Sequence, residues 1–192
     1  MRTLSMVLAL LTGLFVSSSM RAASVCPSLG YATAGCDLII TVTDSGTTVT
    51  PGPSYTLAGG TYDGSDDTLI GIVNNSSSAL SSINLSSSTD IFGFDGDGID
   101  GYGAPGNTMD DSGYGGPNTY FTNINASFTG GTANFLTPLA AGGGSTYFSL
   151  EEALDTSTLT AGSGVTPEPN TFVLLGTALA GMAGAARRRF AS

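Results

Sequence analysis

The sequence predicts an all-β, β-sandwich-like domain in the middle of the chain. Short apolar runs alternate with polar residues at a period of two, and β-branched and aromatic residues dominate these runs. The runs recur about every dozen residues, between turns rich in Gly, Asn and Ser. No long helical period separates them, which argues against an α/β fold.

Five segments meet the strand criteria, and we expect the domain to span residues 24–154. The predicted strands are Leu38–Val42, Leu69–Val73, Ile83–Leu85, Ile91–Phe94 and Tyr120–Phe128. One short helix is predicted where Ser149 precedes Glu152 by three residues, because this is the spacing of a capping box. Residues 155–166, rich in Ser, Thr and Gly, are typical of a linker.

The charge distribution excludes several classes of protein. The 192 residues include 15 Asp and Glu but only 5 basic residues, all Arg, which gives a net charge of −10 with no His. No cationic residue occurs between Arg21 and Arg187. Without His or Lys the familiar nucleophile and base pairs cannot form, and without cations a nucleic-acid backbone cannot be bound. We therefore expect neither an enzyme nor a nucleic-acid-binding protein.

Residues 1–23 predict a signal peptide. Arg2 supplies a positive start, and the apolar run Leu4–Val16 is shorter than the roughly 20 residues that a membrane-spanning helix needs. Small residues follow, so we expect cleavage between Ser19 and Ala23. The alternative is a buried helix of the folded domain. The first interpretation places the domain that follows outside the cytoplasm.

Residues 167–192 combine three features in a fixed order. Pro167, Glu168 and Pro169 come first, the apolar stretch Thr171–Ala186 follows, and Arg187, Arg188 and Arg189 come last. As a helix the apolar stretch would be about 24 Å long, and arginines that extend to the interface can make up the difference from a bilayer core of about 30 Å. We expect a single transmembrane helix with the arginines in the cytoplasm.

This order of features resembles the PEP-CTERM sorting signal of exported bacterial proteins, over Pro167 to Arg189. The resemblance implies that exosortase, an integral-membrane protease, recognises the tail and cuts near the triplet. It also implies a stay in the inner membrane as a single-pass protein before processing, and then a location at the cell surface or outside the cell, in bacteria that make exopolysaccharide and biofilm matrix. Exopolysaccharide is then a candidate partner. An ordinary membrane anchor is the alternative.

The two cysteines of the chain, Cys26 and Cys36, follow the signal region directly. They lie ten residues apart in a chain that is expected to leave the cytoplasm, where disulfides form. A redox-active pair would have the shorter CxxC spacing. We therefore expect a structural disulfide that fixes the new N-terminus.

The acidic run Asp95–Gly101 is a candidate calcium site. Its carboxylates Asp95, Asp97 and Asp100 alternate with glycines, as in the first half of a calcium-binding loop. An EF-hand needs Glu at the twelfth position, which here is Gly106, so we expect a different kind of loop. Further ligands could come from Asp90, Asp110 or Asp111. The alternative is that Asp and Gly simply make turns.

A second acidic turn, Tyr62–Asp67, precedes a predicted strand. Its carboxylates could serve another cation site or a glycosidase-like acid pair, and the alternative is again a turn. Tyr102, Tyr114 and Tyr120 are candidates for stacking on sugar rings.

Three hypotheses for function follow. The first is an exported protein of the cell envelope or extracellular matrix, sorted by exosortase, with a non-enzymatic structural or interaction role. The second is a calcium-dependent carbohydrate-binding or adhesive module that uses the loop Asp95–Gly101. The third is a secreted glycoside hydrolase that uses an Asp pair.

Overall fold

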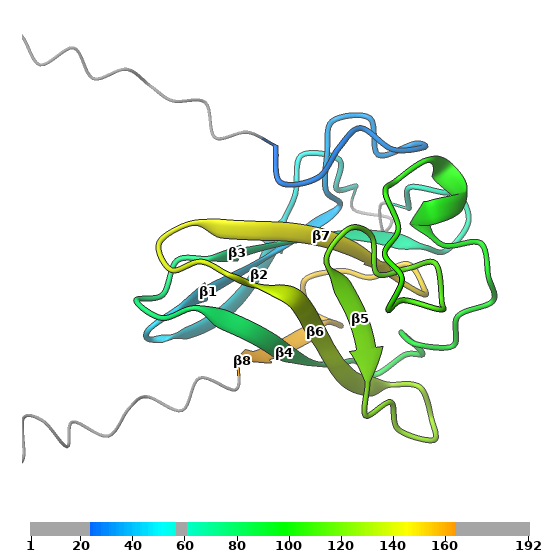
Figure 1. Cartoon of the computed structure of the whole chain (residues 1–192). Coiled ribbons are helices and arrows are strands. Elements are labelled where there is room, and N and C mark those ends of the chain that lie inside the picture. The colour runs from blue at the N-terminus through cyan, green and yellow to red at the C-terminus, as the bar shows by residue number, and fades with distance from the viewer. Residues whose placement is uncertain (1–23, 57–60, 164–192) are drawn as a thin grey trace, which may run out of the picture.

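The fold is all-β, as the sequence predicts. The computed structural model describes residues 24–56 and 61–163. The predicted signal peptide (1–23) and sorting tail (167–192) lie outside the described residues. Within those residues, two four-stranded sheets and one short 3-10 helix, Ile99–Tyr102, make up the regular structure (Figure 1). No helix among them is long and apolar enough to cross a membrane.

The strand order is β2-β1-β3-β7 in the first sheet and β5-β6-β4-β8 in the second. Strands β1 and β3 pair in parallel, and the other named pairs are antiparallel. The chain changes sheet after β3, after β6 and after β7. The strands are β1 (Leu38–Thr43), β2 (Gly46–Pro51), β3 (Thr68–Asn74), β4 (Leu80–Ser86), β5 (Thr119–Thr122), β6 (Gly130–Leu139), β7 (Gly144–Leu150) and β8 (Thr160–Ser163).

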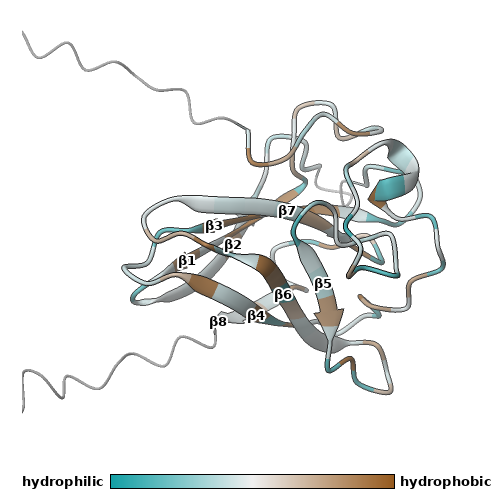
Figure 2. Ribbon diagram, in the orientation of Figure 1, coloured by the Kyte–Doolittle hydropathy of each residue, from teal (hydrophilic) through white to brown (hydrophobic). Residues whose placement is uncertain are grey.

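Both sheets contribute to one hydrophobic core. In β1, Leu38, Ile40 and Val42 are fully buried and alternate with half-buried residues, as expected for a strand with one face inward. Ile83 of β4 and Phe135 of β6 belong to the same core from the other sheet. Apolar residues lie along β4, β5 and β6 (Figure 2). Each buried side chain of this size contributes about 1.5–3 kcal/mol, so the core specifies the two-layer arrangement.

A second, smaller cluster covers the outer face of the first sheet. Leu29 from the N-terminal segment and Ile99 from the 3-10 helix pack with Leu69 of β3. The N-terminal segment and the 3-10 helix lie on the same side of β7 in Figure 1. The first sheet is therefore covered on both faces, which explains why Leu69 and Ile70 are both fully buried.

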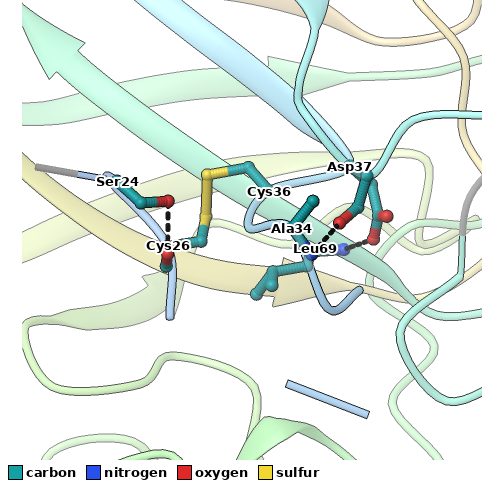
Figure 3. The surroundings of a disulfide bond; sticks show 7 residues. Ser24, Cys26, Ala34, Cys36, Asp37 and Leu69 are labelled. Atoms are coloured by element: carbon teal, nitrogen blue, oxygen red, sulfur yellow. Dashed lines mark hydrogen bonds between the residues drawn. A yellow bond between two sulfur atoms is a disulfide. The ribbon is translucent and has the colours of Figure 1, made fainter. Parts of the chain in front are cut away.

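The predicted disulfide is confirmed: Cys26 and Cys36 are bonded to each other. The bridge lies against β3 at Gly71, where a Cβ atom would collide with the Cys36 sulfur. Beside it, the backbone N–H of Asp37 donates to the Leu69 carbonyl at 2.9 Å, and Figure 3 shows the carboxylate of Asp37 on the backbone of Leu69. The N-terminal segment is thus joined to the central strand of the sheet.

Buried Asn74 holds together two of the connections between the sheets. Its side-chain amide donates to the carbonyls of Ser78, Leu139 and Ala140 at 2.8–3.2 Å. Its side-chain oxygen accepts from the N–H and hydroxyl of Ser76. One side chain therefore fixes both the β3–β4 and the β6–β7 crossings. The β6–β7 crossing is a short turn over residues 140–143.

Three predicted strands are confirmed, since 38–42, 69–73 and 83–85 lie within β1, β3 and β4. The strand predicted at Ile91–Phe94 is wrong. The Asp90 carboxylate accepts the N–H groups of Phe92 and Gly93 and turns the chain there. The strand predicted over 120–128 ends at Thr122, because Asn123 has a positive φ of 55°.

The predicted helix after Ser149 is also wrong. Ser149 is fully buried in β7, and its N–H donates to the Tyr114 carbonyl at 2.8 Å. Glu152 has a φ of 71°, which is incompatible with a right-handed helix. Pairing with β3 extends β7 to Leu150, so tertiary contacts outweigh the local capping pattern.

The predicted linker over 155–166 begins inside the domain. Asp155 accepts the N–H groups of Ser157 and Thr158 in a tight turn, and Thr160–Ser163 then forms β8 along β4. The second sheet therefore continues beyond the boundary predicted at Leu154.

Replacing Asn74 should uncouple the two crossings. We expect Asn74→Ala to lower the free energy of unfolding by about 2–3 kcal/mol, because buried carbonyls lose their donor. Urea denaturation of the full-length chain measures this loss. Asn84→Ala, on the exposed face of β4, is the matched control and should cost much less. Equal losses for the two variants would contradict the role of Asn74.

Removal of the disulfide should also destabilise the domain. For the double variant Cys26→Ala with Cys36→Ala, we expect the free energy of unfolding to fall by about 2–3 kcal/mol. The bridge between residues ten apart then no longer restricts the unfolded chain. Thermal and urea unfolding of the oxidised protein give the value, and reduction of the wild type should reproduce it. An unchanged midpoint in both experiments would show that the bridge contributes nothing.

Candidate functional site

Two buried carboxylates meet where β3 begins and β7 ends. Thr68 of β3 pairs with Leu150 of β7, and the next residues outward are Asp67 and Glu151. Asp67 is fully buried and Glu151 is 8% exposed. The Thr68 hydroxyl accepts the N–H of Leu154 and donates to the Glu152 carbonyl, which holds the turn after β7 against β3. The sheet register therefore brings together two acidic residues that are far apart in sequence.

Two buried tyrosines lie beside these carboxylates. The Tyr62 hydroxyl donates to Asp67 Oδ2 at 2.7 Å. The Tyr114 hydroxyl lies 2.8 Å from Asp97 Oδ1 and 3.2 Å from Asp95 Oδ1, and it also interacts with Glu151. Burial and the neighbouring carboxylates raise the pKa of both phenols. The hydroxyls therefore stay protonated and act as donors.

Asp66 adds a third carboxylate to this pair. The loop that carries it is shaped by Asp63, whose side chain accepts the N–H groups of Asp66 and Asp67. One carboxylate oxygen from each of Asp66, Asp67 and Glu151 lies within 4.8 Å of the others. Asp66 is the least buried of the three. We call these three residues the acidic cluster.

Full ionisation of the acidic cluster is unfavourable without a counter-ion. Burial raises the pKa of Asp67 to about 8, against the lowering effect of the Tyr62 hydroxyl. Burial also raises the pKa of Glu151. At an effective dielectric constant of 20, two ionised carboxylates about 5 Å apart repel by about 3 kcal/mol. Asp67 Oδ1 and Glu151 Oε2 are buried and accept no hydrogen bond from the described residues.

The three calcium ligands predicted in 95–101 do not all come together in the structure. Asp95 and Asp97 share the Tyr114 hydroxyl, whereas the Asp100 carboxylate lies against Gly106. Hydrogen bonding between Asp95 and Asp97 lowers the pKa of the first and raises that of the second. Burial and the Asp110 charge raise the pKa of Asp100. Within the described ranges, the acidic cluster is the group of three carboxylates close enough to share one ion.

The other carboxylates proposed as further ligands have different roles. Asp90 caps the turn at Phe92 and Gly93, and Asp110 accepts from the N–H and hydroxyl of Ser112. Asp111 is exposed. For Asp90 and Asp110 the turn interpretation of the sequence describes the structure.

The predicted sugar-stacking tyrosines divide into two kinds. Tyr114 is fully buried and packs on Phe94 with ring centroids 4.4 Å apart, so its face is closed to a ligand. Tyr120 is half-buried. Tyr102 is 41% exposed and contacts Tyr62 edge to face. Tyr31, which the sequence does not single out, is 75% exposed and lies beside Gly64 of the second acidic turn, Tyr62–Asp67.

Sequence reasoning identified Asp66 and Asp67 as a second acidic turn but missed their partner. The helix predicted after Ser149 would place Glu151 in its first turn, and that helix does not form. The apolar alternation of Phe148 and Leu150, both fully buried, is the signal that could have identified a strand ending directly before Glu151.

The comparisons with known proteins bear on the C-terminal segment. Residues 165–189 match the family model of the PEP-CTERM protein-sorting motif. The resemblance noted for this segment is thus confirmed. Neither a curated protein nor a solved structure matches the chain. The matched residues lie outside those that the structure describes.

The motif assigns the chain to a sorting route. It supports exosortase-dependent sorting of an exported protein, and hence an interaction with exosortase, a membrane protein. The disulfide between Cys26 and Cys36 agrees with export, because disulfides persist in oxidising compartments. The motif covers no residue of the acidic cluster, so it assigns no role to it.

Another buried carboxylate, Asp37, leads to a pH prediction. Burial raises its pKa from 3.8 to about 6, although the Leu69 N–H at 2.8 Å opposes the shift. Because the folded pKa lies above the unfolded one, Asp37 contributes stability in its protonated form, and this contribution is lost as the pH rises from about 4 through 6.

We compare the free energies of unfolding of Asp37→Asn and the wild type. As the pH rises from 4 to 7, we expect this difference to shift in favour of Asp37→Asn by about 1–3 kcal/mol. The amide oxygen can still accept the Leu69 N–H, so the main change is the loss of the titrating group. Urea unfolding of both proteins across this range measures the difference. A difference that stays constant from pH 4 to pH 7 would show that Asp37 does not titrate in the folded protein.

Proposed function

We propose that this chain is an exported protein whose β-domain has a non-enzymatic structural or interaction role at the cell surface or in the extracellular matrix. Exosortase cuts the tail near Pro167 to Pro169, after a stage in which residues 171–186 hold the protein in the inner membrane. The observation that carries the proposal is the match of residues 165–189 to the PEP-CTERM protein-sorting motif.

The composition of the domain supports a role without catalysis. No His or Lys occurs in the chain, and its five arginines lie near the ends, so a nucleophile would lack the usual base. A glycosidase needs two carboxyl groups that flank a substrate in a groove. Asp67 and Glu151 are instead buried. An acidic, polar surface also suits a hydrated matrix, in which exopolysaccharide is the proposed neighbour.

Processing of the tail provides the direct test. Mass spectrometry of the surface-located protein should find a C-terminus near the Pro167–Pro169 triplet, with Arg187 to Ser192 missing. Pro167→Ala combined with Glu168→Ala should leave the tail intact and the protein in the inner membrane. Asn170→Ala is the matched control next to the triplet and should be processed normally. An intact tail on wild-type protein at the surface would contradict processing and favour a plain anchor.

A further inference from the structure

We propose that the acidic cluster of Asp66, Asp67 and Glu151 binds one calcium ion. This site differs from the loop that the sequence suggested, because it combines the turn before β3 with the end of β7. The inference goes beyond sorting and assigns a ligand to the domain itself.

The two buried carboxylates are incompletely hydrogen-bonded. Each has one oxygen without a hydrogen-bond donor among the described residues, Oδ1 of Asp67 and Oε2 of Glu151. Both side chains are more than nine-tenths buried. Buried polar atoms are almost always partnered, so these two oxygens point to a ligand of positive character.

Residues 24–56 and 61–163 cannot supply a positively charged partner. The described residues contain no Lys, Arg or His. The backbone N–H groups of Asp66 and Asp67 are directed to Asp63. An ion from solution can approach from the side of Asp66, the least buried of the three. The spacing of the three oxygens, within 4.8 Å of one another, suits a single ion bonded to each at about 2.3–2.6 Å.

The donor set selects the kind of ion. All three ligands are carboxylate oxygens, and both cysteines are in a disulfide, which disfavours zinc and other metals that prefer nitrogen or sulfur. Magnesium keeps most of its water and is usually held by one or two carboxylates. Three carboxylates, two of them buried, fit calcium better, with water or carbonyl oxygens completing its shell of six to eight ligands.

The tyrosines complete the arrangement. Tyr62 holds Oδ2 of Asp67 and so directs the unpartnered Oδ1 away from itself. The Tyr114 hydroxyl lies near Glu151 and lowers its pKa, while it donates to Asp97 at 2.8 Å. Hydrogen bonds of this kind orient metal-binding carboxylates. The bound ion would link the turn before β3 to the turn after β7. The hydroxyl of Thr68, at the start of β3, already bonds to the backbone of the turn after β7.

Terbium luminescence tests the site, because Tb³⁺ substitutes for calcium and is excited by nearby tyrosines such as Tyr62. The full-length chain, purified in a non-ionic detergent, should show tyrosine-sensitised Tb³⁺ emission that calcium displaces. Asp66→Asn and Glu151→Gln should each weaken binding at least about tenfold. Calcium should also raise the melting temperature of the wild type in a concentration-dependent manner.

Two matched controls define the site. Asp111→Asn removes an exposed carboxylate outside the cluster and should leave the affinity unchanged. Asp100→Asn tests the loop suggested by sequence and should also leave it unchanged. Asp66→Asn changes the least buried ligand, so it keeps the test valid if Glu151→Gln fails to fold.

Several results would overturn the proposal. Absence of sensitised emission would show that protons, and not a metal ion, neutralise the cluster. Loss of binding only in Asp100→Asn would move the site to the loop 95–101, and equal displacement by magnesium would refute the calcium assignment. None of these outcomes affects the processing experiment, which reads the C-terminus alone, so failure of one proposal is distinguishable from failure of the other.

Discussion

The absence of positive side chains from Ala22 to Ala186 is the constraint on which the rest of this structure depends. Carboxylates in most domains can pair with Lys or Arg, but here they rely on backbone N–H groups and hydroxyls. Asp63, Asp90 and Asp155 each accept backbone N–H groups in turns, and Asp37 does so from a neighbouring strand. Cohesion therefore comes from the shared core and from backbone geometry, and it is insensitive to the screening of ion pairs by salt.

Much of the fold could be predicted because its central strands carry their own signal. The apolar runs at Leu38–Val42 and Leu69–Val73 form the centre of the first sheet, between the second sheet and the smaller cluster. Local pattern and tertiary contact therefore agree. Strands such as β2 and β8, rich in Thr, Gly and Ser, have no such pattern. They form because the edges of β1 and β4 offer unpaired backbone groups. That opportunity exists only in the folded molecule and cannot be seen in a local window of sequence.

The candidate site illustrates the same limit. The run Asp95–Gly101 attracted a calcium prediction because its ligand types are close in sequence, yet such spacing is also what turns require. Asp67 and Glu151 are brought together by the pairing of Thr68 with Leu150, and a register between distant strands is not readable from spacing. The sorting motif was predictable for the opposite reason. Its features follow one another along the chain, and it is recognised in that linear order.

The position of β8 has a mechanical consequence. Ser163, the last residue of this edge strand, is separated from Pro167 by three residues, which span at most about 14 Å when fully extended. Any traction at the C-terminus, from the membrane or from a later attachment, would pass almost directly into β8. This strand is held by its ladder to β4. Under tension it would be the first part to detach, and the remaining sheet would keep its hydrophobic contacts until that ladder had opened.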